Sequence, residues 1–212
     1  MIAALYVAKG GCYFGLEGVD PWDEARDARL YAGPWPVVAH PPCQRWGRYW
    51  GGGPSLHGTP KQKIKGDDGG CFAAALASVR AWGGVLEHPE ASAAWAAHGL
   101  IAPPRDGGWV TAGDWLGWTC CVEQGHYGHR GRKATWLYAV SRHLPILRWG
   151  ASSAGVRLDE GFHTSEERTE ARAAGAAPID RLTERERIAT PPAFREVLLE
   201  LARSSRPVTV PA

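Results

Sequence analysis

The amino-acid sequence predicts a single α/β domain with a mostly parallel sheet flanked by helices. Two observations support this fold class. A strand pattern, a helix pattern and a second strand pattern follow one another over residues 36–89, an order typical of a parallel βαβ unit. The chain has 212 residues, of which 44% are hydrophobic and 22% charged. That size and composition are typical of one globular domain.

The first predicted elements are a strand and a short helix. Residues 2–7 are apolar and form a strand that leads into Gly10 and Gly11. Two glycines form a simple turn or let the backbone approach a cofactor. Asp20 begins a helix that runs to about residue 30, because an aspartate cap followed by proline fits a helix start.

The central predicted strand covers residues 37–39, which are apolar and rich in valine. Pro41 and Pro42 end this strand, because proline cannot donate a hydrogen bond to a sheet. Cys43 therefore follows a strand at its carboxyl end, where open α/β sheets build their sites. The thiol is a candidate nucleophile, and a small buried apolar side chain is the alternative interpretation.

A long loop follows over residues 45–68, with lysines at positions 61, 63 and 65 that either contact phosphates or lie on a solvated face. A helix over 71–82 and a strand over 85–89 come next. The carboxyl ends of parallel strands meet at one edge of a sheet, and neighbouring strands lie about 4.8 Å apart. We therefore expect Cys43 and Glu87 to share one pocket.

Glu87 lies on this second buried strand, where an unpaired carboxylate would cost several kcal/mol. A structural role would require a partner such as Arg132, Lys133 or a loop histidine. We expect the carboxylate instead to be held for a ligand.

The second half of the chain predicts a helix over 91–98 and strands over 118–124 and 134–140, joined by a basic, glycine-rich loop. His126 and His129 of that loop lack the spacing of a zinc site, so we predict no metal. The loop is better suited to line an anionic or hydrogen-bonding ligand.

Within the single predicted domain, residues 1–212, three segments are distinguished. Residues 36–148 form a catalytic-core-like region, and 149–190 form a polar, partly irregular segment. Residues 191–203 form a final helix whose apolar face docks on the sheet.

The overall composition excludes several classes of protein. A net charge of +2 gives no general attraction to nucleic acid, so such binding must come from local clusters. The five cysteines are an odd number without a disulfide spacing, which favours a reducing, cytoplasmic setting. No run of about 20 apolar residues is present for a membrane span. The sequence does not specify an oligomeric state.

Three motifs resemble the catalytic half of the DNA cytosine-5 methyltransferases, in the order of that family. Pro42-Cys43-Gln44 matches its nucleophile motif, and residues 85–89 stand where it has its glutamate motif, with His88 in place of the usual asparagine. Residues 128–133 resemble its arginine-bearing motif. The similarity is closer to divergent, often phage-encoded relatives with a histidine–proline–proline–cysteine turn, and it covers about residues 36–148.

The resemblance implies an abbreviated, Rossmann-like methyltransferase fold and a pyrimidine substrate, cytosine in DNA, flipped out of the duplex. Cys43 would add to carbon 6 of the base, Glu87 would bind the ring, and Arg132 or Lys133 would bind the base carbonyl. The implied base-binding or nucleic-acid-binding residues are His40, Pro42, Gln44, Trp46, His129, Arg130, Arg132, Lys133 and Thr135.

The implied cofactor is S-adenosylmethionine, although the chain could also act without one. Only 42 residues precede Cys43, and Gly10, Gly11 and Asp20 are the positions there that would line its site. Two alternatives to a DNA-modifying enzyme stay open. One is a non-catalytic nucleic-acid-binding protein, and the other is an enzyme that acts on free nucleotides.

Overall fold

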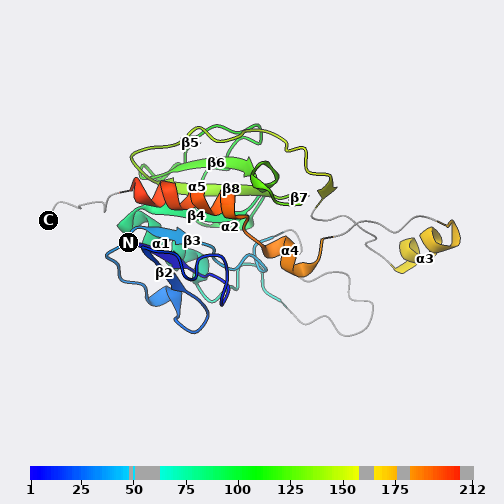
Figure 1. The fold of residues 1–212 in the computed structure, drawn as a ribbon, viewed down its shortest axis with the longest axis horizontal. Helices are drawn as coiled ribbons and strands as arrows, with labels where there is room; N and C mark the ends of the chain where they lie inside the picture. The colour runs from blue at the N-terminus through cyan, green and yellow to red at the C-terminus, as the bar shows by residue number, and fades with distance from the viewer. Residues whose placement is uncertain (48–49, 51–62, 158–164, 176–181, 206–212) are drawn as a thin grey trace.

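A seven-stranded sheet forms the centre of the fold in the computed structural model (Figure 1). The structure describes residues 1–47, 50, 63–157, 165–175 and 182–205. In spatial order the strands are β2 (Val19–Trp22), β1 (Ile2–Leu5), β3 (Val37–Ala39), β4 (Gly84–Pro89), β8 (Ala134–Val140), β6 (Trp118–Glu123) and β5 (Val110–Thr111). Short β7 (Gly131–Arg132) and β9 (Val156–Arg157) pair separately.

The predicted single α/β domain with flanking helices and parallel core strands is confirmed, but the sheet is mixed and not mostly parallel. β2, β1, β3 and β4 run parallel, whereas β4, β8, β6 and β5 pair antiparallel. β6 and β8 pair antiparallel because the connection between them, residues 124–133, is short. A parallel return needs a crossover of about a dozen residues or more, usually helical. The predicted parallel βαβ unit of β3, α1 (Cys71–Trp82) and β4 is confirmed.

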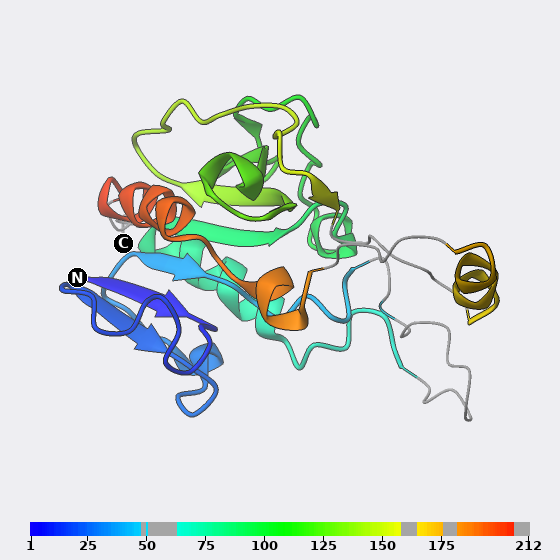
Figure 2. The same cartoon turned by 45° about the vertical axis from the view of Figure 1, so that its right-hand side comes forward.

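Helices cover both faces of the sheet, with α1 on one and α5 (Pro192–Arg203) on the other (Figure 2). Side chains alternate along each strand, so Ala39 and Leu86 pack toward α1, while Val38 and Val85 pack toward α5. The other helical segments are short, namely η1 (Ala28–Leu30), α2 (Ala93–Ala97), η2 (Gln124–Tyr127), α3 (Ser165–Ala173) and α4 (Glu184–Ile188).

The predicted helix over residues 20–30 is wrong. Residues 19–22 form β2 at the edge of the sheet, where Pro21 is tolerated because one side of an edge strand needs no hydrogen-bond donor. Asp20 does not cap a helix. Its carboxylate binds the side chains of Arg26 and Trp22, and only η1 is helical in this region.

Parts of two predicted segments lie outside the described residues. They are residues 48–49 and 51–62 of the long loop, including the lysine at 61, and residues 158–164 and 176–181 of the polar segment. Within the described ranges, no helix combines the length and apolar character that a membrane crossing requires.

Candidate functional site

The carboxyl ends of β3 and β4 place Glu87 beside His40. The two strands are parallel, and Ala39 is in register with Leu86, so His40 and Glu87 form the next pair. Both side chains point to the face that α5 covers, because neighbours along a strand alternate. His40 Nδ1 lies 3.0 Å from Glu87 Oε2. The partners expected for a structural Glu87 were Arg132, Lys133 or a loop histidine, and His40, which follows β3, is a histidine partner of this kind.

Glu87 belongs to a hydrogen-bonded chain, the Glu87 network, formed by Tyr13, His40, Glu87, Gln124 and Thr135. The Tyr13 hydroxyl lies 2.8 Å from His40 Nε2. On the other side of the carboxylate, Gln124 Nε2 donates to Glu87 Oε1 at 3.1 Å and to Thr135 Oγ1 at 2.9 Å. The network thus joins the loop after β1 to the ends of β3, β4, β6 and β8.

The surroundings of Glu87 keep it ionised. Burial raises the pKa of the carboxyl, but the hydrogen bond from His40 and the positive charge of Lys133 outweigh burial and hold the pKa at about 2. Lys133 is itself buried, and its ammonium donates to the Ala189 carbonyl at 2.9 Å. The site therefore contains a fixed anion and a nearby buried cation.

Cys43 lies at the start of the turn that follows β3, and its carbonyl accepts hydrogen bonds from the amides of Trp46 and Gly47. Burial and the negative charge of Glu87 raise the pKa of the thiol, while the positive charge of Lys133 lowers it. The resting thiol is therefore protonated at neutral pH. Cys43 and Glu87 nevertheless lie within electrostatic range of each other, at one edge of the sheet.

His88, which belongs to the glutamate-like motif, and Trp46, a predicted base-binding residue, pack in the core under α1. His88 is 1% exposed, and its Nδ1 pairs with Ser92 Oγ at 2.7 Å. Burial lowers the pKa of His88 to about 4, so the ring is neutral. Trp46 donates to Asp68 Oδ2 at 2.7 Å and packs against Phe72.

The predicted binding residues of the basic loop before β8 fall into two groups, those that bind later segments of the chain and those that reach the site. His129 and Arg130 hold Glu186 of α4, through its carbonyl and its carboxylate respectively. Arg132 is exposed and donates to the Ala154 carbonyl at 3.1 Å. These three side chains bind later segments of the chain, Glu186 and Ala154. Only Lys133 and Thr135 extend into the site.

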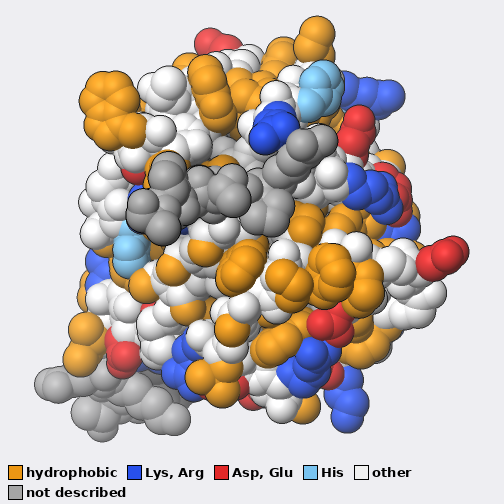
Figure 3. Space-filling view, turned by 90° about the vertical axis from the view of Figure 1, so that its left-hand side faces the viewer, with side chains coloured by type: hydrophobic (Ala, Val, Ile, Leu, Met, Phe, Trp, Pro, Cys, Tyr) orange, Lys and Arg blue, Asp and Glu red, His pale blue; other side chains and the backbone are white. Residues whose placement is uncertain are grey.

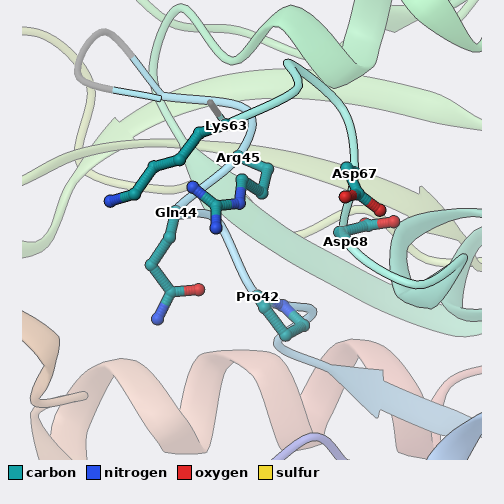
Figure 4. A pocket seen from close by; sticks show the side chains of 6 residues that line it. All are labelled: Pro42, Gln44, Arg45, Lys63, Asp67 and Asp68. Atoms are coloured by element: carbon teal, nitrogen blue, oxygen red, sulfur yellow. The ribbon is translucent and has the colours of Figure 1, made fainter. Parts of the chain in front are cut away.

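Pro42 and Gln44, the residues on either side of Cys43 in the sequence, line a cavity of about 450 Å³. Figure 4 shows Gln44, Arg45 and Lys63 on one side of it and two aspartates on the other. The carboxylate of Asp68 is already used by Trp46 and by backbone amides at the start of α1. The cavity is lined by Pro42, Gln44, Arg45, Lys63, Asp67 and Asp68.

The predicted cofactor residues do not fit S-adenosylmethionine. In α/β folds such a cofactor lies between a glycine-rich turn and the first turn of the following helix, but here β1 leads through its loop directly to β2. Asp20 is paired with Arg26 and Trp22, and Tyr13 of the same loop packs against His40. Neither the cavity above nor a smaller one beside Cys121 is lined by Gly10, Gly11 or Asp20.

Two members of the network, Tyr13 and Gln124, are absent from the sequence-based set of site residues. Gln124 is the last residue of the strand predicted over 118–124, at the end of the sheet where Glu87 lies, and this position is the signal that would have found it. Tyr13 carries no comparable signal, because its loop has no regular pattern. In the described part of the chain, no group of three or more histidine, cysteine, aspartate or glutamate residues is arranged to hold a metal ion.

Comparison with models of protein families, with curated proteins and with solved structures finds no match for this chain. The resemblance to the DNA cytosine-5 methyltransferases therefore rests on the three motifs, and the geometry of Cys43, Glu87 and Lys133 carries the argument about function.

Proposed function

We propose that this protein is an enzyme that binds a flipped pyrimidine base of DNA, cytosine, and activates carbon 5 of that base by forming a bond between Cys43 and carbon 6. One observation carries the proposal. A thiol and an ionised, buried carboxylate lie at the ends of two adjacent parallel strands, with a buried ammonium in range of both.

The chemistry uses each of these groups. Carbon 5 of a pyrimidine becomes nucleophilic once a thiolate adds to carbon 6. The sulfur–carbon bond forms, the electrons of the C5–C6 double bond move toward N3, and N3 gains a proton. That proton balances the one that the thiol loses, so the addition needs no oxidant, reductant or cofactor.

The protein supplies charge stabilisation for this step. Lys133 favours the thiolate form of Cys43. The ionised carboxylate of Glu87, held in place by His40 and Gln124, would stabilise the ring nitrogen once that nitrogen has taken a proton from water, while the thiol proton passes to water. Groups fixed in this way before the reaction are worth about 10² to 10³ in rate each.

DNA would reach the site from the side of the 450 Å³ cavity. Arg45 and Lys63 provide positive charge there for backbone phosphates, which position a duplex without reading its sequence. The face at the amino-terminal ends of the parallel strands is different. Figure 3 shows side chains of both charges interspersed with hydrophobic ones on that face.

Two other functions each have an observation in their favour. The raised pKa of the Cys43 thiol and the poor fit of the N-terminal loop to S-adenosylmethionine favour a protein that binds nucleic acid without catalysis. The cavity volume of about 450 Å³ is in the usual range for small-molecule sites, which favours an enzyme that acts on free nucleotides.

One experiment separates the three functions. The protein is incubated with an oligonucleotide that contains 5-fluorocytosine and analysed by native mass spectrometry without denaturation, because the addition is reversible. A covalent adduct survives collisional activation, whereas a non-covalent complex dissociates. We expect an adduct with the wild type and with Cys71→Ala, a matched control at the start of α1, and none with Cys43→Ala. Binding without an adduct would favour the non-catalytic protein. An adduct with the free fluorinated nucleotide alone would favour the third function.

A further inference from the structure

Basic side chains of the loop before β8 are bound by one short segment that includes α4, which we call the α4 strap (residues 182–189). The Arg130 guanidinium donates to both carboxylate oxygens of Glu186, at 2.9 and 3.4 Å. His129 Nε2 lies 2.9 Å from the Glu186 carbonyl oxygen. Two residues that the sequence analysis expected to bind nucleic acid are therefore engaged by the protein itself.

The strap lies at the edge of the sheet that carries the candidate site. Both ribbon views show α4 beyond the carboxyl end of β3 (Figures 1 and 2). The Lys133 ammonium, whose charge acts on both Cys43 and Glu87, donates to the Ala189 carbonyl at 2.9 Å. The strap is therefore attached to the charged groups of the site.

The attachment of the strap is mainly polar and lies at the surface. None of the residues of α4 is buried, and Ile188 is 68% exposed. Leu182, which precedes the helix and packs against Gly131, is the buried anchor. A helix of five residues is not stable by itself, and an ion pair that reaches solvent, as that of Arg130 with Glu186 does, is weak and screened by salt.

The Glu186 carboxylate has two roles in the strap. It closes a capping box at the start of α4, where the Thr183 amide and hydroxyl donate to Oε2 at 2.7 and 2.8 Å. It also pairs with Arg130, and these hydrogen bonds hold its pKa at about 2, so it is ionised at neutral pH. A guanidinium binds carboxylate and phosphate oxygens with the same fork of N–H groups. Glu186 thus occupies Arg130 in the way that a phosphate would.

We propose that the α4 strap is an autoinhibitory segment that competes with DNA for the basic loop, and that the DNA backbone displaces it from Arg130. The inference rests on the proposed function, because it takes DNA as the partner of this edge of the sheet. One carboxylate on a short exposed helix competes there with the several phosphates that a duplex presents at once. The strap lowers the apparent affinity for DNA in proportion to the fraction of molecules in which it is attached.

The test compares the DNA affinities of Glu186→Gln and the wild type. A fluorescently labelled duplex is titrated with each protein at one fixed salt concentration, because phosphate contacts depend on salt. We expect Glu186→Gln to bind about 2- to 5-fold more tightly, the factor that corresponds to one exposed ion pair. Glu184→Gln is the matched control, because it removes the same charge from an exposed position of the same helix. It is expected to stay within about 1.5-fold of the wild type.

The gain in affinity must depend on Arg130. In an Arg130→Gln background, Glu186→Gln is expected to give no further gain, because the ion pair is already absent. An affinity of Glu186→Gln equal to or below that of the wild type would overturn the inference. The same gain in Glu184→Gln, or in the Arg130→Gln background, would also overturn it, since the effect would then come from the general loss of negative charge.

Hydrogen exchange measures the displacement of the strap itself. Its helix is held by backbone hydrogen bonds such as that from the Arg187 amide to the Thr183 carbonyl, at 3.0 Å. A saturating concentration of the duplex is expected to accelerate amide exchange in peptides that cover residues 182–189, because a released helix of this length loses its hydrogen bonds. Unchanged or slower exchange with bound DNA would overturn the inference, since the strap would then stay attached.

These outcomes differ from a failure of the proposed function. A Cys43 adduct without a gain of DNA affinity in Glu186→Gln removes only the role of the strap. Absence of the Cys43 adduct, with the gain that depends on Arg130 still present, removes the enzyme and leaves a DNA-binding protein with a displaceable strap.

Discussion

Replacing Glu87 by glutamine tests the electrostatics of the site most directly. The change keeps the shape of the side chain and removes its charge. The carboxyl has a pKa of about 2 in the folded protein, against about 4.5 in an unfolded chain. A difference of that size corresponds to about 3 kcal/mol of folding stability at neutral pH. The variant also leaves Lys133 buried beside a neutral group.

We expect Glu87→Gln to lower the free energy of unfolding by about 2 to 3 kcal/mol at pH 7. A group whose folded pKa is depressed stabilises the fold above its unfolded pKa, and the contribution is lost as pH falls through the folded value. The difference between variant and wild type should therefore be constant above about pH 5 and shrink toward pH 2. The proposed adduct should form about 10² to 10³ times more slowly in the variant.

The assay is urea unfolding followed by tryptophan fluorescence at several pH values. Glu90→Gln serves as the control, because Glu90 pairs with the exposed Arg105 at the surface, and such pairs contribute about 0 to 1 kcal/mol. A loss below about 0.5 kcal/mol in Glu87→Gln, or a loss that does not vary with pH, would refute the reasoning. In either case the network would not hold an ionised carboxylate.

Three further predictions concern the core, the backbone and the DNA surface. The buried His88 ring has a pKa of about 4 against 6.5 unfolded, so its contribution, present above pH 6.5, should fall by up to about 3 kcal/mol toward pH 4. Urea unfolding over that range checks this, and constant stability would contradict it. Gly84→Ala should lower the free energy of unfolding by more than about 3 kcal/mol, because Gly84 has φ +117° and a Cβ there would lie 1.9 Å from the Val37 carbonyl oxygen. An unchanged melting temperature would exclude that close approach. Arg45→Ala and Lys63→Ala should each reduce the slope of log K against log salt for DNA binding by about 1, and unchanged slopes would remove the proposed DNA surface.

The sequence predicted the half of the fold that depends on local patterns. The run of valines before Pro41, the helical period over 71–82 and the second strand identified β3, α1 and β4. Because a βαβ crossover brings the strands parallel, the same patterns were sufficient to place Cys43 near Glu87. The antiparallel half was missed, although the connection between β6 and β8 is visible in the sequence and is too short for a parallel return.

The contacts of the site depend on tertiary packing and could not be read from local patterns. His129, Arg130 and Arg132 carry the composition of a binding loop, yet their partners, Glu186 and Ala154, come from a segment without regular pattern. Asp20 followed by proline resembles a helix cap, but pairing with β1 overrides that local preference.

Exchange of hydrogen at carbon 5 of cytosine tests the central claim most directly. Reversible addition of a thiol at carbon 6 labilises the C5–H bond, so it needs no cofactor and no second substrate. An oligonucleotide with deuterium at carbon 5 of its cytosines is incubated with the protein, and the label is followed by mass spectrometry of the recovered DNA. The account predicts loss of deuterium with the wild type and with Cys71→Ala, and full retention with Cys43→Ala. Retention with the wild type, or equal loss with Cys43→Ala, would contradict it.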